Sequence, residues 1–364
     1  MELYVMNSKE RLIAALHGEE IDHIPFSPFL AYVWEYFPRE IQEAGKLAFH
    51  HAVGADPLWR GGPCPAAETV PPEVEYKTIE EGNCSVTVID TPVGSLRKTR
   101  TRSEAGGTDF LVEHPLKSEE DYKVQMWIEE HTVLKPNSEK IEEHFRGDGR
   151  EGLSLGMLIP RGKSAYQFMV EHLAGTEELI YAVMDFPDTV LALREIMVDK
   201  DREAVRIALE SKFEYFTTWE DSSTQNYSPA QYDDYIGSEI SEWCSMLESR
   251  GKRYIQHACG HVAALLEPMK ENGVFAVESL SPPPTGNISV RDARAIARND
   301  MGIIGGIEPT EFLNLSEKEL GTYAESVIDE AKGGPFVLAN SDSCPPGVTV
   351  EKFRLVSEVA RTCG

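Results

Sequence analysis

From residue 150 onward, short apolar runs alternate with longer stretches whose apolar residues recur with helical spacing. The expected strands span 153–159, 213–219, 252–258, 274–279, 302–307 and 335–340. The expected helices span 176–210, 229–249, 261–271, 289–299, 316–332 and 349–362. Strands that alternate with helices favour parallel pairing through β–α–β crossovers.

Two further strand-like runs, 23–29 and 55–60, precede this region, and helices are expected at 31–37 and 40–52. The total of eight strands is the number in a closed (β/α)8 barrel. An open doubly wound sheet fits the same order of elements, but no GxGxxG motif follows the first strand. We therefore expect an α/β fold of the TIM-barrel type.

Two additions to the barrel are expected within one domain spanning residues 1–364. Residues 8–17 predict a leading helix, with Ser8 as its N-cap and Gly18 as its stop. Residues 61–150 predict an insertion after the second strand. Within it, the alternation in CSVTVID and SLRKTRT, separated by TPVG, predicts a β-hairpin. Acidic helices are expected near 118–131 and 137–146.

The amino-acid composition indicates which kinds of binding partner and which cellular compartment to expect for this protein. Hydrophobic residues make up 41% of the chain, and the formal net charge is −26. Such an acidic chain repels phosphate backbones and anionic membranes, so neither nucleic acid nor membrane is an expected partner. The sequence has no long apolar run and no visible secretory signal. Six cysteines without a secretion signal favour the reducing cytoplasm over a disulfide framework.

Charged and metal-capable residues concentrate where the expected strands end, the face that carries the active site in a barrel. His257 and Cys259 are two positions apart, so both can point to one side of the fifth strand. Cys344 follows the last strand and can meet them across the mouth. Imidazole with two thiolates is a good zinc set that leaves the fourth position open, where Glu278 is a candidate. An H-x-C pair is weak evidence alone, because a buried and satisfied histidine is commoner and neither CxxC nor HExxH occurs.

Four stretches of the sequence resemble the uroporphyrinogen decarboxylase superfamily, and within it the zinc- and corrinoid-dependent methyltransferases. They are KERLIAALHGEEIDHIPF, EDSSTQNYSPAQYDDYI, HACGHVAALLEPMKENGVFAVES and ANSDSCPPGVTVEKFRLV. The resemblance implies that His257, Cys259 and Cys344 bind zinc. The cobalamin-independent methionine synthases have a similar site with a glutamate after the H-x-C, which Glu278 matches less securely.

The same resemblance argues against decarboxylation of a porphyrinogen. True decarboxylases carry an arginine-rich stretch near the first strand, whereas residues 28–39 contain no arginine before Arg39. Aromatic residues there, including Tyr32 and Trp34, suit an apolar or aromatic substrate, although some of them can equally belong to the core of a helix. At the strand ends, Arg161 and Asn340 are further candidates for substrate contact.

These features predict a methyltransferase that moves a methyl group between a small methylated ether, amine or thiol and a corrinoid (cobalamin). No D-x-H-x-x-G loop is present, so the corrinoid is expected on a partner protein. Zinc would act as Lewis acid, and Glu220 or Asp221 would donate a proton to the leaving atom. One of these acids can instead cap a helix or pair with Arg161. The alternatives are a metal-free decarboxylase and a non-catalytic barrel that binds a corrinoid protein or a methylated ligand.

Overall fold

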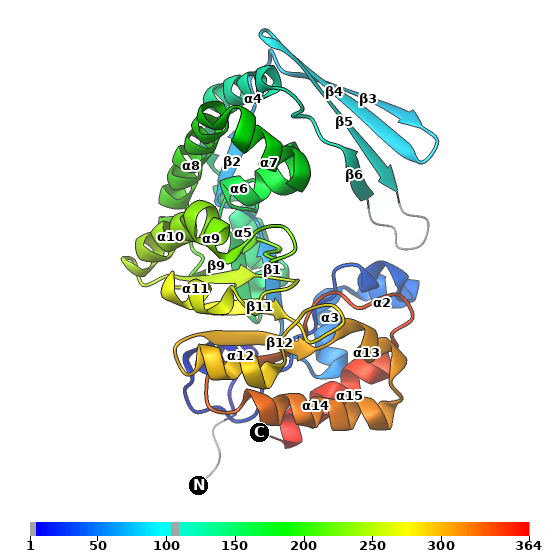
Figure 1. Cartoon of the computed structure of the whole chain (residues 1–364). Helices are drawn as coiled ribbons and strands as arrows, with labels where there is room; N and C mark the ends of the chain where they lie inside the picture. The colour runs from blue at the N-terminus through cyan, green and yellow to red at the C-terminus, as the bar shows by residue number, and fades with distance from the viewer. Residues whose placement is uncertain (1–4, 103–108, 364) are drawn as a thin grey trace.

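The computed structural model describes residues 5–102 and 109–363. Its centre is a curled parallel sheet of seven strands in the order β1-β8-β9-β10-β11-β12-β13 (Figure 1). The strands are β1 (Leu58–Gly62), β8 (Leu153–Met157), β9 (Tyr215–Trp219), β10 (Arg253–His257), β11 (Ala276–Leu280), β12 (Gly302–Ile307) and β13 (Phe336–Asn340). The ends of all seven strands differ by at most three residues from those that the sequence predicts. The fold class is therefore α/β with a parallel sheet.

The expected first strand, 23–29, is reduced to a single parallel bridge between Phe26 and Leu338. Ser27 donates to the carbonyl of Leu338 at 2.9 Å, and Asp56 donates to the carbonyl of Phe26 at 2.8 Å. The segment thus lies between β13 and the start of β1. Pro25 and Pro28 have no N–H group, which limits how far a ladder can extend. This arrangement of a curled sheet with a connecting segment is consistent with a TIM-like barrel.

Helices surround the sheet. Before β8 they are α1 (Ser8–His17), η1 (Val33–Tyr36), α2 (Arg39–Ala44), α3 (Lys46–Val53), α4 (Glu119–His131), α5 (Ser138–Arg146) and η2 (Asp148–Arg150). After β8 they are α6 (Ala165–Phe168), η3 (Met169–Leu173), α7 (Thr176–Asp185), α8 (Pro187–Leu209), α9 (Pro229–Tyr232), η4 (Asp233–Gly237), α10 (Ser238–Glu248), α11 (Leu266–Glu271), α12 (Val290–Ala297), α13 (Pro309–Asn314), α14 (Glu317–Ala331) and α15 (Val350–Thr362). Of these, η3 and η4 are π-helical turns.

The leading helix α1 covers the amino-terminal ends of the strands. Its Leu12 and Leu16 share a buried cluster with the first residues of several strands, including Leu58, Leu153 and Tyr215. The N-cap of α1 is Asn7 and not the predicted Ser8, because the Asn7 side chain accepts the Glu10 N–H in a capping box. The helix ends at Gly18 as expected, in a left-handed conformation. With the opposite end closed by this helix, the carboxyl ends of the strands remain as the open face.

The residues between β1 and β8 contain a four-stranded antiparallel sheet that projects beyond α4 and α7 (Figure 1). Its strands are β3 (Glu75–Glu81), β4 (Cys84–Thr91), β5 (Gly94–Arg102) and β6 (Asp109–Glu113). The predicted hairpin is the pair β4–β5, whose last paired residues are Thr91 and Gly94. A second antiparallel pair joins β2 (Ala66–Thr69) to β7 (Val133–Pro136). Among the described residues, no helix is long and apolar enough to cross a membrane.

Candidate metal centre at the carboxyl ends of the strands

Asp221, His257 and Cys259 meet where β9 and β10 end. One potential ligand atom from each of the three lies within 4.8 Å of the others. The His257 Nε2 atom is 3.3 Å from Asp221 Oδ1, and the Cys259 thiol donates to the same oxygen at 3.0 Å. Parallel pairing places Trp219 beside His257, so residues that follow the two strands emerge side by side. The strand register therefore accounts for the cluster.

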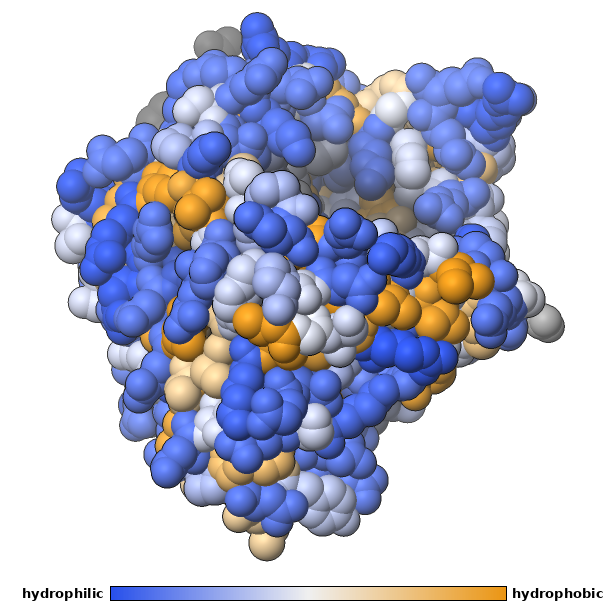
Figure 2. All heavy atoms as spheres, turned by 90° about the horizontal axis from the view of Figure 1, so that it is seen from above, coloured by the Kyte–Doolittle hydropathy of each residue, from blue (hydrophilic) through white to orange (hydrophobic). Residues whose placement is uncertain are grey.

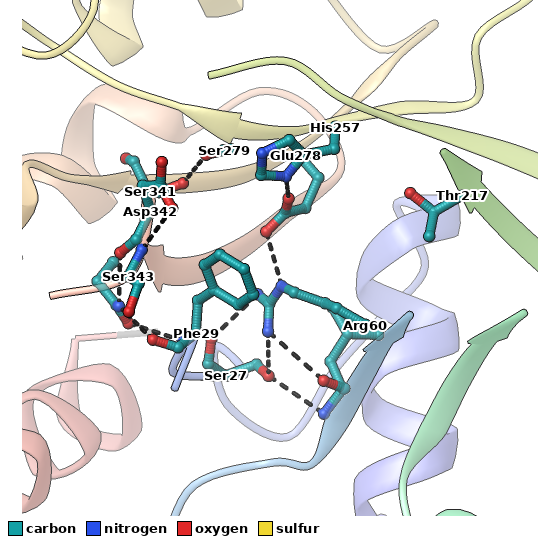
Figure 3. Close-up of polar contacts among 12 residues, drawn as sticks. Ser27, Phe29, Arg60, Thr217, His257, Glu278, Ser279, Ser341, Asp342 and Ser343 are labelled. Carbon is teal, nitrogen blue, oxygen red and sulfur yellow. Dashed lines mark hydrogen bonds and ion pairs between the residues drawn. The ribbon is translucent and has the colours of Figure 1, made fainter. Parts of the chain in front are cut away.

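The carboxylate of Glu278 fixes the orientation of the His257 ring through the ring nitrogen Nδ1. Glu278, the β11 residue paired with His257, forms a hydrogen bond with His257 Nδ1 through Oε2. Its other oxygen accepts from Arg60 Nε at 2.6 Å (Figure 3). This arrangement leaves Nε2 directed at Asp221. A histidine whose second nitrogen is bound to a carboxylate is the usual form of a metal-ligating imidazole.

The surroundings of the cluster favour a positive charge on His257 and a negative charge on Asp221. Burial lowers the pKa of His257, but Glu278 and Asp221 outweigh it and raise that pKa well above its ordinary value. Burial alone would raise the pKa of Asp221, yet His257 and Lys163 lower it below its usual range. Burial raises the pKa of the Cys259 thiol to about 12. These directions favour a protonated His257 beside an ionised Asp221, and a bound cation would displace the protons of His257 and Cys259.

The donor set fits zinc. A thiol, an imidazole and a carboxylate converge on one small volume, and imidazole and thiolate are ligands that zinc prefers. Asp221 also has a left-handed backbone, with φ of 44°, which is uncommon for a residue other than glycine and concentrates at functional sites.

Two aromatic rings pack near the buried imidazole of His257. The Trp219 ring lies 4.8 Å from the imidazole and the Phe29 ring lies 6.0 Å from it, measured between centroids. The Arg60 guanidinium lies over the Phe29 ring at 5.3 Å. Phe29, Arg60 and Trp219 also line a small, mostly apolar cavity of about 170 Å³. These side chains give the surroundings of His257 an apolar wall.

A basic and an acidic side chain adjoin the cluster, and sequence reasoning missed both. Lys163 forms ion pairs with Asp221 and, at 3.0 Å, with Glu171. Burial raises the pKa of Glu171 to about 7, although Lys163 acts in the opposite direction. Glu171 lies in the π-helical turn η3. Lys163 follows Arg161 by two residues, so reading the whole loop after β8 would have identified it, whereas no sequence signal marks the π-turn.

Glu220 was predicted as one of two possible proton donors, and the structure does not bring it to the cluster. Its side chain is fully buried and accepts from the backbone and hydroxyl of Ser164, both at 2.8 Å, and from Thr218 at 2.7 Å. Ser164 precedes α6, so Glu220 braces the start of that helix. The sequence left open that one of the two acids caps the helix after this strand, whereas Glu220 contacts the residue before α6, a helix that precedes it in the chain, and Ser228 caps the following helix α9.

Two predicted metal ligands, Glu278 and Cys344, also lie outside the cluster of three. Glu278 is engaged by both Arg60 and His257, so its role here is to orient the histidine. Cys344 is 1% exposed and belongs to the hydrophobic core. Burial, together with the charge of Asp342, raises the pKa of its thiol. Asp221, predicted as an acid, is the side chain that joins His257 and Cys259.

Of the four predicted substrate contacts, only Tyr32 faces the mouth. Its side chain is exposed, its backbone N–H donates to Ser343 in the loop after β13 at 2.8 Å, and partial burial together with Asp342 and Asp221 raises the pKa of its phenol. Trp34 packs edge-on against Phe37 and Phe49 in the core. The remaining two are committed elsewhere. Arg161 pairs with Asp201 and Glu129, and Asn340 is fully buried against the backbone of Phe29.

The fold and the cluster together define a parallel α/β barrel-like protein with a candidate metal centre at the carboxyl ends of its strands. Residues 168–363, more than half of the chain, match the family described as uroporphyrinogen decarboxylase (URO-D). The chain therefore belongs to the URO-D family.

The fold occurs in a solved structure. A methyltransferase from Methanosarcina mazei is similar with a TM-score of 0.62 and 12% sequence identity, over 98% of this chain and 98% of that chain. A B12-independent methionine synthase from Shewanella sp. W3-18-1, in complex with selenomethionine, gives a TM-score of 0.48 and 9% identity, over 93% of this chain and 97% of that chain. The first likeness shows a shared fold. No curated protein matches the sequence.

Proposed function

We propose that this chain is a zinc-dependent methyltransferase that moves a methyl group between a small methylated ether, amine or thiol and the corrinoid of a partner protein. The observation that carries the proposal is the convergence of Asp221, His257 and Cys259 at the carboxyl ends of β9 and β10. Membership of the URO-D family and the fold shared with a methyltransferase support it.

In this proposal His257, Cys259 and Asp221 hold the metal. Cys344 remains a proposed ligand on the resemblance alone, and it would have to leave its buried position in the loop after β13. A zinc ion bound there supplies Lewis acidity toward the heteroatom that loses or gains the methyl group. Glu278 and Arg60 fix the orientation of the His257 ring.

In this proposal, residues beside the metal ligands exclude water and supply a proton. Phe29 and Trp219 exclude water from the face of His257. Glu171, whose pKa of about 7 leaves it partly protonated at neutral pH, holds a proton on its carboxyl oxygen for the atom from which methyl departs. Lys163 lies between Glu171 and Asp221, contacts both carboxyl groups and balances the negative charge of Asp221.

A spectroscopic assay with free cobalamin tests the proposal. Zinc-loaded protein is mixed with methylcobalamin and a thiol acceptor, and separately with reduced cobalamin and a panel of methyl ethers, methylamines and thioethers. We expect a change in the cobalamin spectrum that requires the protein in at least one direction. Cys259→Ala should abolish it, and the matched control Cys84→Ala, in the distant antiparallel sheet, should retain it. Absence of turnover in both directions would refute the proposal.

A further inference from the structure

A second cavity, of about 310 Å³, lies between the antiparallel sheet, α4 and the turn formed by α6 and η3. Its walls combine apolar and basic side chains. Ile89, Ile128 and Phe168 supply hydrocarbon surface, and Lys98, Arg100 and His172 supply nitrogen atoms. Neither the metal cluster nor the smaller cavity beside His257 includes these residues.

Two of the basic residues of β5, Lys98 and Arg100, line this cavity, and neither has an ion-pair partner among the described residues. Lys98 and Arg100 are two positions apart and so point to the same face of the strand. Arg97, on the opposite face, pairs with Glu113. Within residues 5–102 and 109–363, no carboxylate forms an ion pair with either Lys98 or Arg100. Burial and the adjacent Arg100 lower the pKa of Lys98, as expected for neighbouring like charges that lack an anion.

The remaining charged groups around the cavity do not cancel this excess. The guanidinium of Arg161 is balanced by its ion pairs with Glu129 and Asp201. Glu68 also lines the cavity; burial raises its pKa while Arg161 acts in the opposite direction, and within the described part of the chain it forms no ion pair with Lys98 or Arg100. Lys98 and Arg100 thus place two neighbouring cations on the wall of a partly apolar cavity, in a chain whose formal net charge is −26.

His172 connects the cavity to the metal cluster. Its Nε2 atom lies 3.8 Å from Glu171, which pairs with Lys163, and Lys163 in turn pairs with Asp221. Burial, with Lys163 and Arg100 nearby, lowers the pKa of His172 to about 4. The ring is therefore neutral at physiological pH and adds a hydrogen-bonding group without adding charge.

From this arrangement we infer that the cavity binds a small organic carboxylate, with the carboxylate between Lys98 and Arg100 and the hydrocarbon body against Ile89, Ile128 and Phe168. The position next to Glu171 makes this ligand the methyl-bearing or methyl-accepting substrate. That assignment rests on the proposed function, whereas the binding of a carboxylate does not.

Calorimetric titration with benzoate tests the inference. Benzamide, which has the same shape without the charge, and inorganic phosphate, an anion without hydrocarbon, are the comparison ligands. We expect benzoate to bind at least tenfold more tightly than either. Lys98→Gln and Arg100→Gln should each weaken benzoate binding about tenfold, a change of about 1.4 kcal/mol. Arg97→Gln, which removes the same charge from the opposite face of β5, should leave the affinity unchanged.

Three outcomes would overturn the inference: benzoate binding no tighter than benzamide, phosphate binding as tightly as benzoate, or Arg97→Gln weakening benzoate as much as Arg100→Gln. Failure of the proposed function is distinguishable, because the titration needs neither zinc nor corrinoid. Cys259→Ala should bind benzoate with unchanged affinity. A protein that binds benzoate but transfers no methyl group would refute the proposed function, and it would still support the inference that the cavity binds a small organic carboxylate.

Discussion

At the scale of single residues, His257 is held between two carboxylates, one on each ring nitrogen. Glu278 bonds Nδ1 and Asp221 faces Nε2. Of these two carboxylates, only that of Asp221 lies close to the Cys259 thiol. The first therefore sets the direction of the ring, and the second belongs with the proposed ligands.

Glu278→Gln should accordingly weaken zinc binding without removing a ligand. Loss of a partner that orients a metal-bound histidine typically lowers metal affinity by about 10- to 100-fold. Competition with a chromophoric zinc chelator measures the change. Glu171→Gln is the matched control, since it makes the same replacement without touching His257, and it should keep the original affinity. Equal losses in both variants would contradict the orienting role of Glu278.

The pH dependence of demethylation should report on Glu171. Burial raises its pKa to about 7, so the proton that it can donate is present below that pH and lost as pH rises through it. We expect turnover of an unactivated methyl ether to fall above about pH 7. Glu171→Gln should lower the rate and flatten this limb while zinc stays bound. An unchanged profile in the variant would assign the proton transfer to another group.

Much of this site follows from the sequence, for a physical reason. Parallel strands bring their carboxyl ends to one edge, so His257, Cys259 and Asp221 were all identified as residues of the mouth. The choice between Glu220 and Asp221 was not predictable, because the left-handed backbone of Asp221 changes the direction of the chain. The role of Glu171 depends on a π-helical turn, which leaves no periodic signal.

At the scale of elements, the segment around Phe26 is held in place by side-chain hydrogen bonds as well as by its single β-bridge to Leu338. Asn340, at the end of β13, accepts from the Phe29 N–H at 2.9 Å and donates to the Phe29 carbonyl at 2.8 Å. A strand interrupted by prolines is thereby held against its neighbour.

Asn340→Ala should therefore destabilise the fold. The variant leaves two backbone groups of Phe29 without partners, at a cost of about 2–4 kcal/mol. A lower urea midpoint with an unchanged slope would show this loss. If Asn340 instead contacts substrate, as its position at a strand end predicted, the variant would raise KM and leave the urea midpoint unchanged.

Elements with a clear apolar period were predictable, and elements without one were not. The hairpin β4–β5 and the seven strands of the main sheet follow from their patterns. Strand β3 (EYKTIEE) is exposed at every position, so no alternation marks it. The pair β2–β7 joins residues far apart in the chain, which local pattern does not reveal. The expected helix 176–210 is divided before Pro187, where proline begins α8.

At the scale of the whole molecule, the distribution of charge favours the proposed methyl transfer over the decarboxylation of uroporphyrinogen, for which the family is named. Hydrophilic side chains cover most of the face seen in Figure 2, with hydrophobic groups confined to small patches. The chain carries a formal charge of −26. Arg39, the first arginine after residue 28, pairs with Glu43 on an exposed helix. The segment near the first strand therefore offers no cluster of arginines to a substrate with many carboxylates.

We therefore expect no coproporphyrinogen when the protein is incubated with uroporphyrinogen. Chromatography of the oxidised products, with an authentic uroporphyrinogen decarboxylase as the positive control, measures this. Steady formation of coproporphyrinogen would place the chain with the decarboxylases and overturn the choice of methyl transfer.

The central claim is that His257 and Cys259 hold a metal ion at the mouth of the barrel. Elemental analysis after equilibrium dialysis against zinc, without chelator, tests it most directly. We predict about one zinc per chain, reduced to background in His257→Ala and in Cys259→Ala, and retained in Cys84→Ala. Cys344→Ala shows whether the late cysteine is a ligand as well. Absence of zinc from the unaltered protein, or full zinc content in His257→Ala and Cys259→Ala, would contradict the account.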